Sequence, residues 1–239
     1  MSEKNDYLIT RATERMHTSI GWLDSYHSFS FGGHHDAQRM GFGPLRVFND
    51  DTVIGGAGFP SHPHRDMEII SIVLEGALMH KDSLGNGRTI KTGDIQYMSA
   101  GSGVVHSEMN ASESETVKFI QLWIEPKEIG LEPIYADRSL LTPEVGQWVT
   151  IVSSDGRDDS MQIRQDALIY SIRMQSGAEA EKRIGLSKKT WVFILEGKVE
   201  LKEPSVTLGA RDSVAIDNAE AVVLKNIGSV EAQILLFEL

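Results

Sequence analysis

The chain has 239 residues, of which 41% are hydrophobic and 24% charged, a balance typical of a folded globular protein and not of a disordered or collagen-like one. Its formal net charge of −11 disfavours direct binding to the phosphate backbone of nucleic acid. The absence of cysteine excludes disulfides, thiolate metal sites, thiol nucleophiles and iron–sulfur clusters.

Short segments rich in Val, Ile, Thr and aromatic residues recur at strand length, separated by Gly, Asn, Asp and Ser. Long amphipathic helical patterns are scarce, so the sequence predicts an all-β protein of sandwich or barrel type. A hairpin turn is expected at residues 84–88, where Leu-Gly-Asn-Gly-Arg tolerates positive φ. In chain order the expected strands are 45–48, 68–74, 95–98, 117–124, 167–174, 190–195, 213–216, 221–224 and 231–237.

A short sequence repeat suggests two related halves. Residues 72–76, Ile-Val-Leu-Glu-Gly, resemble residues 193–197, Phe-Ile-Leu-Glu-Gly, about half a chain further on. Each is followed by a second strand, a polar turn and a stretch with Gly and Asp, which favours two β-barrels in tandem. Coincidence between two ordinary strand ends is the alternative. Residues 125–146, with three prolines, are expected to form the linker.

The histidines gather in the first half of the chain, since all eight lie at or before His106. The motifs His62-Pro63-His64 and His106-Ser107-Glu108 each place two metal-binding side chains at i and i+2, which share one face of a strand. The intervening segment is long enough for a hairpin that returns the second motif to the first. His62, His64, His106 and Glu108 are therefore predicted to hold a divalent first-row metal ion and to leave coordination positions open.

The remaining histidines are interpreted as structural or surface residues, because an isolated histidine on a strand is more often one of these than a ligand. They are His17, His27, His34, His35 and His80. Glu68 competes for the first motif, but we expect it to lie beside the ligands without binding the metal.

These residues resemble the motifs of the cupin superfamily, although Ser99 stands where a proline is common and the spacings around the first motif differ slightly. The first motif is matched by Gly58, His62, His64, Glu68 and Gly76, and the second by Gly93, Gly101, Gly103, His106 and Asn110. More specifically, the chain resembles the pirins, a family with two cupin domains, and among them bacterial pirin-like proteins with quercetinase activity. The matching segments are residues 21–31, 45–47, 62–68, 98–103 and 106–108.

The resemblance implies two tandem jelly-roll-like cupin barrels: an N-terminal metal-binding domain, residues 1–130, and a C-terminal metal-free domain, residues 131–239. Pirins bind their metal through three histidines and a glutamate, which correspond to His62, His64, His106 and Glu108. The implied cofactor is one divalent transition metal, with iron as the first choice, while Mn, Co, Ni, Cu and Zn also suit these ligands.

The implied activity is that of a quercetin 2,3-dioxygenase, which opens the central ring of a flavonol with O2 and releases CO. Glu108 then acts as a ligand or as the base that takes the flavonol proton. Phe42, Phe59, Met67 and Met98 are candidates to line a pocket for this flat substrate, with an ordinary core role as the alternative. We expect a cytoplasmic monomer without a membrane or nucleic-acid partner.

A competing interpretation is a regulatory protein. Eukaryotic pirins are iron-containing nuclear cofactors that bind transcription factors, and some bacterial relatives bind metabolic enzymes. The same four ligands would serve a non-enzymatic, iron-binding role through a protein partner. A cupin with another reaction, such as isomerisation of a sugar or a small acid, is a third possibility, because the fold does not determine the function.

Overall fold

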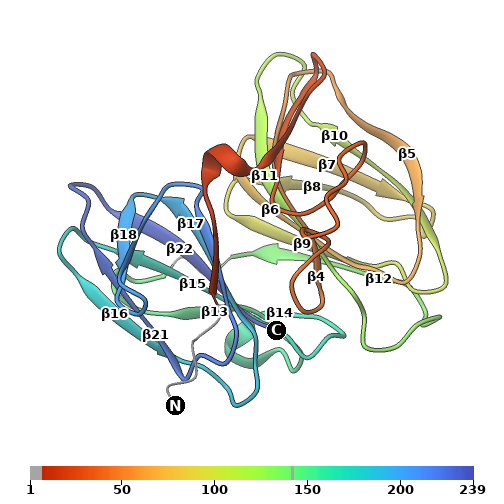
Figure 1. Cartoon of the computed structure of the whole chain (residues 1–239). Helices are drawn as coiled ribbons and strands as arrows, with labels where there is room; N and C mark the ends of the chain where they lie inside the picture. Colours follow the sequence, from red (N-terminus) through yellow and green to blue (C-terminus); the bar gives the residue numbers. More distant parts are fainter. Residues whose placement is uncertain (1–6, 141–142) are drawn as a thin grey trace. The chain divides into compact units, whose positions relative to one another are not determined.

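The computed structural model describes residues 7–140 and 143–239 and is almost entirely β, which confirms the predicted fold class (Figure 1). These residues form two compact units. The N-terminal unit comprises residues 16–140 and 161–166, and the C-terminal unit comprises residues 7–15, 143–160 and 167–239. Within the described residues, no helix has both the length and the apolar character needed to cross a membrane.

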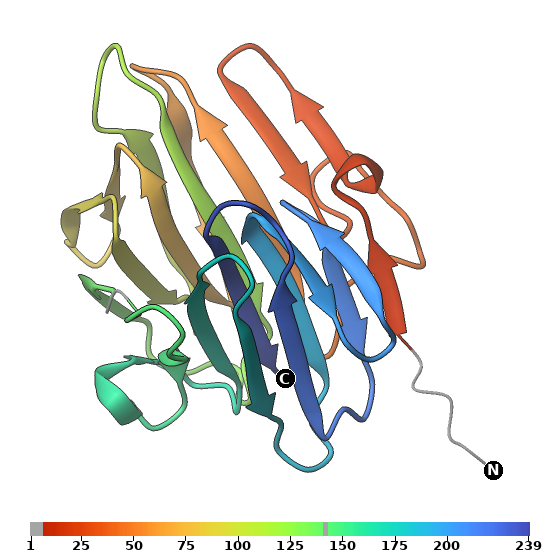
Figure 2. The ribbon, with the colours of Figure 1, turned by 90° about the vertical axis from the view of Figure 1, so that its left-hand side faces the viewer.

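The N-terminal unit consists of two antiparallel sheets. The larger sheet has the order β12-β9-β6-β11-β4-β3-β2 and is coloured from red to green in Figure 2. Its strands are β2 (Met16–Ser19), β3 (Leu23–His27), β4 (Leu45–Val53), β6 (Glu68–Glu75), β9 (Asp94–Ser99), β11 (Val117–Ile124) and β12 (Ile134–Ser139). The smaller sheet has the order β5-β10-β7-β8, with β5 (Gly58–His64), β7 (Ala77–Asp82), β8 (Gly87–Lys91) and β10 (Val104–Asn110). The expected hairpin joins β7 to β8. The two-residue strand β14 (Met161–Gln162) also belongs to this unit.

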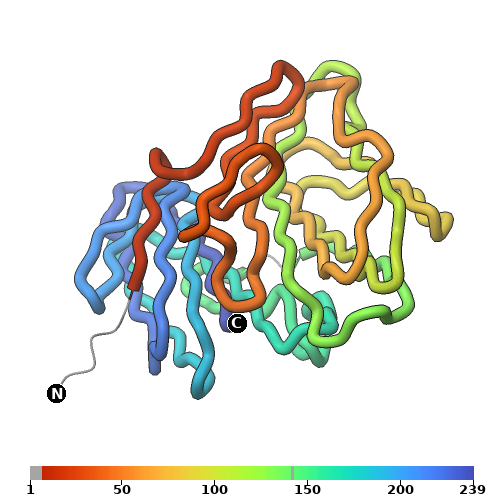
Figure 3. Tube along the Cα trace, turned by 45° about the vertical axis from the view of Figure 1, so that its right-hand side comes forward, coloured from red at the N-terminus to blue at the C-terminus, as the bar shows by residue number. Residues whose placement is uncertain are grey.

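The C-terminal unit again contains a larger and a smaller sheet. The larger one includes, in order, β1 (Tyr7–Thr10), β20 (Ser213–Ile216), β17 (Thr190–Glu196), β22 (Ala232–Glu238), β15 (Leu168–Met174) and β13 (Val149–Ser153). The smaller one has the order β16 (Glu179–Arg183), β21 (Ala221–Asn226), β18 (Lys198–Leu201) and β19 (Val206–Gly209). Figure 3 shows red β1 beside the blue strands, where it pairs with β20. Two short 3-10 helices, η1 (Ala12–Glu14) and η2 (Arg157–Asp159), complete the unit.

The strand order bears out the internal repeat. The neighbours β9-β6-β11-β4 of the N-terminal unit correspond to β20-β17-β22-β15 of the C-terminal unit, and β5-β10-β7-β8 correspond to β16-β21-β18-β19. The two similar sequences end at equivalent tight turns, where Gly76 and Gly197 both have positive φ. A Cβ at Gly76 would lie 2.7 Å from a backbone oxygen, and one at Gly197 would lie 2.8 Å from Ala232. Only glycine fits these turns.

The prediction that residues 125–146 form a linker is wrong over part of that range. Residues 134–139 form β12, which pairs with β9 from Ile134 opposite Ser99 to Ser139 opposite Asp94. Prolines flank this strand without interrupting its ladder, because Pro133 precedes it and Pro143 follows it. The division into domains at residue 130 stays a prediction.

Candidate metal centre

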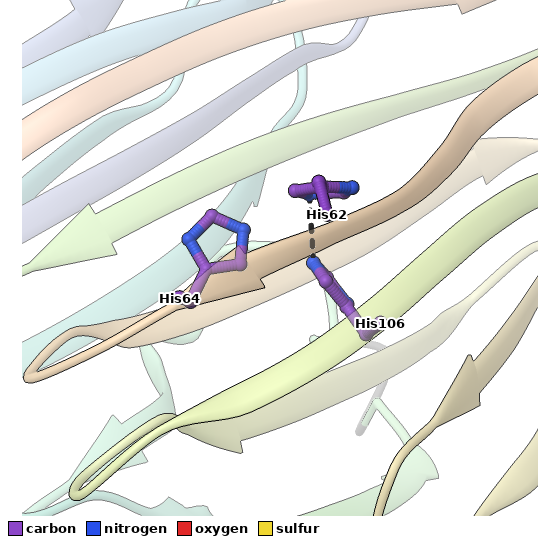
Figure 4. A group of neighbouring side chains, drawn as sticks. All are labelled: His62, His64 and His106. Atoms are coloured by element: carbon purple, nitrogen blue, oxygen red, sulfur yellow. Dashed lines mark hydrogen bonds between the residues drawn. The ribbon is translucent and has the colours of Figure 1, made fainter.

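Two antiparallel strands bring the histidine motifs together. Strand β5 pairs with β10 so that His62 lies opposite His106 and His64 lies opposite Val104. A bulge interrupts this pairing between His106 and Glu108. The rings of the three histidines converge, with centroids 4.5 to 4.8 Å apart (Figure 4). The register thus achieves the convergence predicted for the histidines of the two motifs.

The proton on His62 is located by its hydrogen bond. Its Nδ1 lies 2.7 Å from the backbone oxygen of Pro60. Because a carbonyl oxygen only accepts, Nδ1 carries the proton and donates it. In the neutral ring, Nε2 therefore retains its lone pair.

His80 and Asp82, both on β7, determine which nitrogen of His106 carries the proton. The buried Asp82 carboxylate accepts a hydrogen bond from His80 Nε2 at 3.0 Å. In the neutral His80 ring Nδ1 is then an acceptor, and His106 Nδ1 lies 3.5 Å from it. The proton of His106 is held at Nδ1, and its Nε2 keeps a lone pair. Outer carboxylate–histidine pairs commonly orient metal ligands in this manner.

The two Nε2 atoms face each other 3.0 Å apart, as the dashed line in Figure 4 marks. Two lone pairs at this distance repel unless a proton or a cation lies between them. Two nitrogens at right angles around an ion, with metal–nitrogen bonds of about 2.1 Å, also lie about 3.0 Å apart. His62 and His106, with His64 beside them, therefore have a donor set and spacing that fit a divalent first-row metal ion.

Glu108 adds a buried negative charge, since only 2% of the residue is exposed. One carboxylate oxygen accepts a hydrogen bond from the Ser71 hydroxyl at 3.2 Å, and the other accepts one from Gln121 Nε2 at 2.7 Å. Both donors are neutral, so they orient the carboxylate without neutralising its charge. Buried charges are normally paired or bound to metal, and Glu108 therefore also suits a cation.

The potential ligand atoms fall into two overlapping groups, each within 4.8 Å. The first contains His62, His64 and His106, and the second contains His80, His106 and Glu108. His106 joins them. The assignment of Glu108 as the fourth ligand stays a prediction.

Burial keeps two of the imidazoles neutral. Desolvation, followed by the charges of neighbouring imidazoles, lowers the pKa of His64 from 6.5 to about 4 and that of His106 to about 3. Neutral imidazole is the form that binds metal. Protons therefore compete weakly for these two rings near neutral pH.

The structure makes two expectations about neighbouring residues more specific. His80, interpreted above as structural or surface, is fully buried and contacts His106. The H-x-D spacing of His80 and Asp82 was its only signal in the sequence. Glu68 lies outside both groups: its buried carboxylate accepts hydrogen bonds from the Tyr97 hydroxyl, the Ser99 hydroxyl and the Arg164 backbone.

A cavity of about 500 Å³ is lined by Trp123, which contacts His64, and by none of the candidate ligands themselves. Phe31, Val47 and Met67 contribute apolar walls, and the ring of Trp123, another wall, packs edge-on against His64 with centroids 4.8 Å apart. Trp123 Nε1 also donates a hydrogen bond at 3.4 Å to Gln121, the residue that holds Glu108. The cavity and the candidate metal ligands thus share a wall.

Of the four predicted lining residues, Met67 lines this cavity. Met98 is fully buried in a core cluster with Ile69 and Val104. Phe59 packs against another core cluster, and Phe42 forms an isolated bridge with Leu45. Met98 and Phe59 therefore have the ordinary core role that was the alternative to lining a pocket.

Sequence profiles of two families match the chain. The pirin profile covers residues 9–124, and that of the quercetinase C-terminal cupin domain covers residues 150–239. With the two-sheet units described above, these matches define a protein with two cupin domains, of which the N-terminal one contains the candidate metal centre.

Individual relatives cover nearly the whole chain. The quercetin 2,3-dioxygenase of Escherichia coli (strain K12) is 38% identical over 231 residues, 97% of each chain, and a pirin-like protein of Caulobacter vibrioides is 39% identical over 88% of this chain and 90% of its own. The crystal structure of the bacterial pirin YhhW from Escherichia coli in complex with nickel(II) has a TM-score of 0.92 and 37% identity, covering 98% of this chain and 99% of that one. The chain belongs to the pirin family.

Proposed function

We propose that the protein is a metal-dependent quercetin 2,3-dioxygenase, with His62, His64, His106 and Glu108 as ligands. The domain of residues 1–130 binds the metal in this proposal, and that of residues 131–239 does not. The observation that carries it is the pair of Nε2 lone pairs of His62 and His106, which face each other at a site that shares Trp123 with an apolar cavity. The relative of that name in Escherichia coli and the nickel complex of YhhW support it.

A bound divalent metal would supply Lewis acidity, which lowers the pKa of a hydroxyl group that it holds. Glu108 accepts the proton of the flavonol 3-hydroxyl, and Ser71 and Gln121 keep its carboxylate aimed at that position. The rings of His62, His64 and His106 already lie close together, with His106 buried and the other two half-buried, so little reorganisation is needed on binding.

The overall reaction balances without a further reductant or oxidant. Both atoms of O2 enter the ring-opened product, two carbon–carbon bonds of the central ring break, and the carbon between them leaves as CO with its own oxygen. The proton taken from the 3-hydroxyl returns to the product. The flavonol supplies the electrons that reduce O2.

The cavity suits such a substrate in size and character. Its volume of about 500 Å³ lies within the usual range for small-molecule sites. Phe31 and Trp123, whose rings meet edge to face 5.3 Å apart, offer aromatic surfaces for a flat molecule.

The test is aerobic incubation of the purified protein with quercetin, with and without a chelator. We expect quercetin to be consumed, as followed by its visible absorbance, and CO to be released in an equal molar amount. A chelator should abolish both, and added metal should restore them. A His62→Ala, His106→Ala double variant is the matched control. A metal-loaded protein that leaves quercetin intact would instead favour the regulatory role through a protein partner.

The cofactor in this proposal is one divalent metal, with iron as the first choice because of the oxygen chemistry. Elemental analysis of protein purified without added metal identifies it. The proposal also includes a cytoplasmic location and a monomeric state. Sedimentation measurements test the monomeric state.

A further inference from the structure

A chain of hydrogen bonds runs from a buried carboxylate to the cavity. It starts at Asp51 on β4, passes through Ser25 and His27 on β3 and Thr18 on β2, and ends at His34, which lines the cavity. Asp51, Ser25 and His27 are at most 2% exposed. We refer to these five residues as the Asp51–His34 relay.

The contacts at the buried end of the relay determine which groups donate and which accept its hydrogen bonds. Ser25 donates its hydroxyl proton to Asp51. Its Oγ lies 3.3 Å from Nδ1 of His27 and, having given its proton to Asp51, can only accept there. The side-chain oxygen of Asn49 also lies 2.8 Å from this Nδ1. Nδ1 of His27 therefore carries the proton, and in the neutral ring Nε2 is an acceptor.

The same logic continues to the cavity. Thr18 Oγ1 lies 2.9 Å from Nε2 of His27 and 3.0 Å from Nε2 of His34. Because Nε2 of His27 accepts, Thr18 donates its proton there and accepts from Nε2 of His34. The neutral ring of His34 then has its lone pair on Nδ1. Within the described part of the chain, no side-chain hydrogen bond involves that atom.

We propose that Nδ1 of His34 accepts a hydrogen bond from a phenolic hydroxyl of the substrate, one remote from the reacting 3-hydroxyl, and that Thr18 is the positioning residue that fixes this tautomer. This inference rests on the proposed function and extends it to substrate selection. The relay reaches the cavity on the β2–β3 side, whereas the candidate metal ligands lie on β5 and β10. The enzyme thereby prefers polyhydroxylated flavonols.

The experiment compares two probes: quercetin, and 3-hydroxyflavone, which keeps the reacting hydroxyl and lacks the others. Binding to the purified protein is measured without oxygen, which prevents turnover, and kcat/KM is measured aerobically. The variants are Thr18→Val, which removes the bridging hydroxyl with little change in shape, and Thr18→Ser, which restores it. His34→Phe removes the acceptor itself, and Thr89→Val, at an exposed position of β8, is the matched control.

We expect Thr18→Val and His34→Phe to weaken quercetin binding by about fivefold to tenfold, the usual effect of one hydrogen bond, with 3-hydroxyflavone binding and metal content unchanged. Thr18→Ser and Thr89→Val should bind both probes like the wild type. Equal losses for the two probes, or no loss for quercetin, would overturn the inference.

Failure of the inference and failure of the proposed function give different results. If the wild type cleaves both flavonols and the variants do not discriminate between them, the inference fails and the function stands. If neither flavonol is cleaved but Thr18→Val still weakens only quercetin binding, the function fails and the phenol site stands.

Discussion

At the scale of single residues, the site depends on which nitrogen of each ring holds the proton. His62 and His106 both commit Nδ1 to an acceptor and leave Nε2 facing the other ring. Removal of either imidazole by His62→Ala or His106→Ala should abolish stoichiometric metal binding. Elemental analysis checks this, and full metal occupancy in either variant would show that the ligand set is wrong.

Glu108 is expected to affect turnover more than metal content. Glu108→Gln keeps the size of the side chain but loses the charge, the ability to take a proton and one of the two oxygens that accept hydrogen bonds from Ser71 and Gln121. We expect the variant to retain at least part of the metal and to lose about 100-fold or more in kcat, the usual contribution of a positioned base. Unchanged quercetin turnover at equal metal content would remove Glu108 from the mechanism.

The Asp82–His80 pair should act on metal affinity. Asp82→Asn removes the carboxylate that fixes the His80 tautomer, and with it the acceptor for His106 Nδ1. We expect metal affinity to fall by about tenfold to 100-fold. Competition titration with a chromophoric chelator measures it. Asp24→Asn, which breaks the exposed carboxylate–histidine pair with His17, should leave the affinity unchanged.

The buried imidazoles should make the metal-free protein sensitive to acid. Folding lowers the pKa of His64 from 6.5 to about 4 and that of His106 to about 3, so between these values the unfolded chain binds more protons than the folded one. Stability therefore falls as the pH drops through about 6.5 and stops falling, for these groups, below about 3. Urea unfolding of chelator-treated protein should give a lower free energy at about pH 5.5 than at about pH 7.5. In the His64→Gln variant, which lacks one of these titrating rings, the difference in unfolding free energy between the two pH values should be smaller.

The sequence was sufficient to predict that the side chains of His62, His64 and His106 converge, but not which residues hydrogen-bond to them. The i and i+2 spacing fixes the face on which His62 and His64 lie, whatever the partner strand. The role of His80 depends instead on the register of β7 against β10, which places it opposite Glu108. That pairing is long-range, so His80 alone looks like any buried histidine.

At the scale of elements, polar residues conceal strands from sequence analysis. Residues 45–48 are apolar and predict a strand, but β4 continues to Val53 through Asn49 and Asp51, which are buried because β3 supplies hydrogen-bonding partners. Strand β5 contains Pro60 and Pro63, which are tolerated because it lies at the edge of its sheet.

The repeat also explains why, among the residues that the structure describes, the candidate metal ligands lie in the N-terminal unit. Gly76 is equivalent to Gly197, so the position of His80 corresponds to that of Leu201. Asn110 is equivalent to Asn226, so the positions of His106 and Glu108 correspond to those of Val222 and Leu224. These three are buried in the apolar core of the C-terminal unit. The same framework holds a polar centre in one unit and a hydrocarbon core in the other.

The turn at Gly76 should be the most sensitive point of the β6–β7 connection. Gly76→Ala places a Cβ 2.7 Å from the Thr116 oxygen and forces alanine to adopt positive φ, so we expect a loss of about 2 kcal/mol or more in unfolding free energy. Gly85→Ala has the same φ penalty but meets open space, and should cost about 1 kcal/mol. Equal losses would mean that steric contact at Gly76 is unimportant.

At the scale of the whole molecule, metal binding should stabilise one unit selectively. Nickel(II) is a suitable probe because it binds imidazole and resists oxidation. We expect it to slow amide hydrogen exchange in β5, β10 and β7, and to leave exchange in β16 and β21 unchanged, since no histidine follows His106. Mass spectrometry of the exchanged peptides measures this, and protection spread evenly over both units would contradict a single site.

The pairing of β1 with β20 affects how the protein is made. The strand at residues 7–10 leaves the ribosome before its partner at residues 213–216 has been translated. Domains synthesised first usually fold first, but this strand must wait until the other half of the chain exists. Until then β1 lacks its partner, and its backbone hydrogen-bonding groups are open to other chains. Rapid translation and chaperone cover of this strand would therefore favour the yield of correctly folded protein.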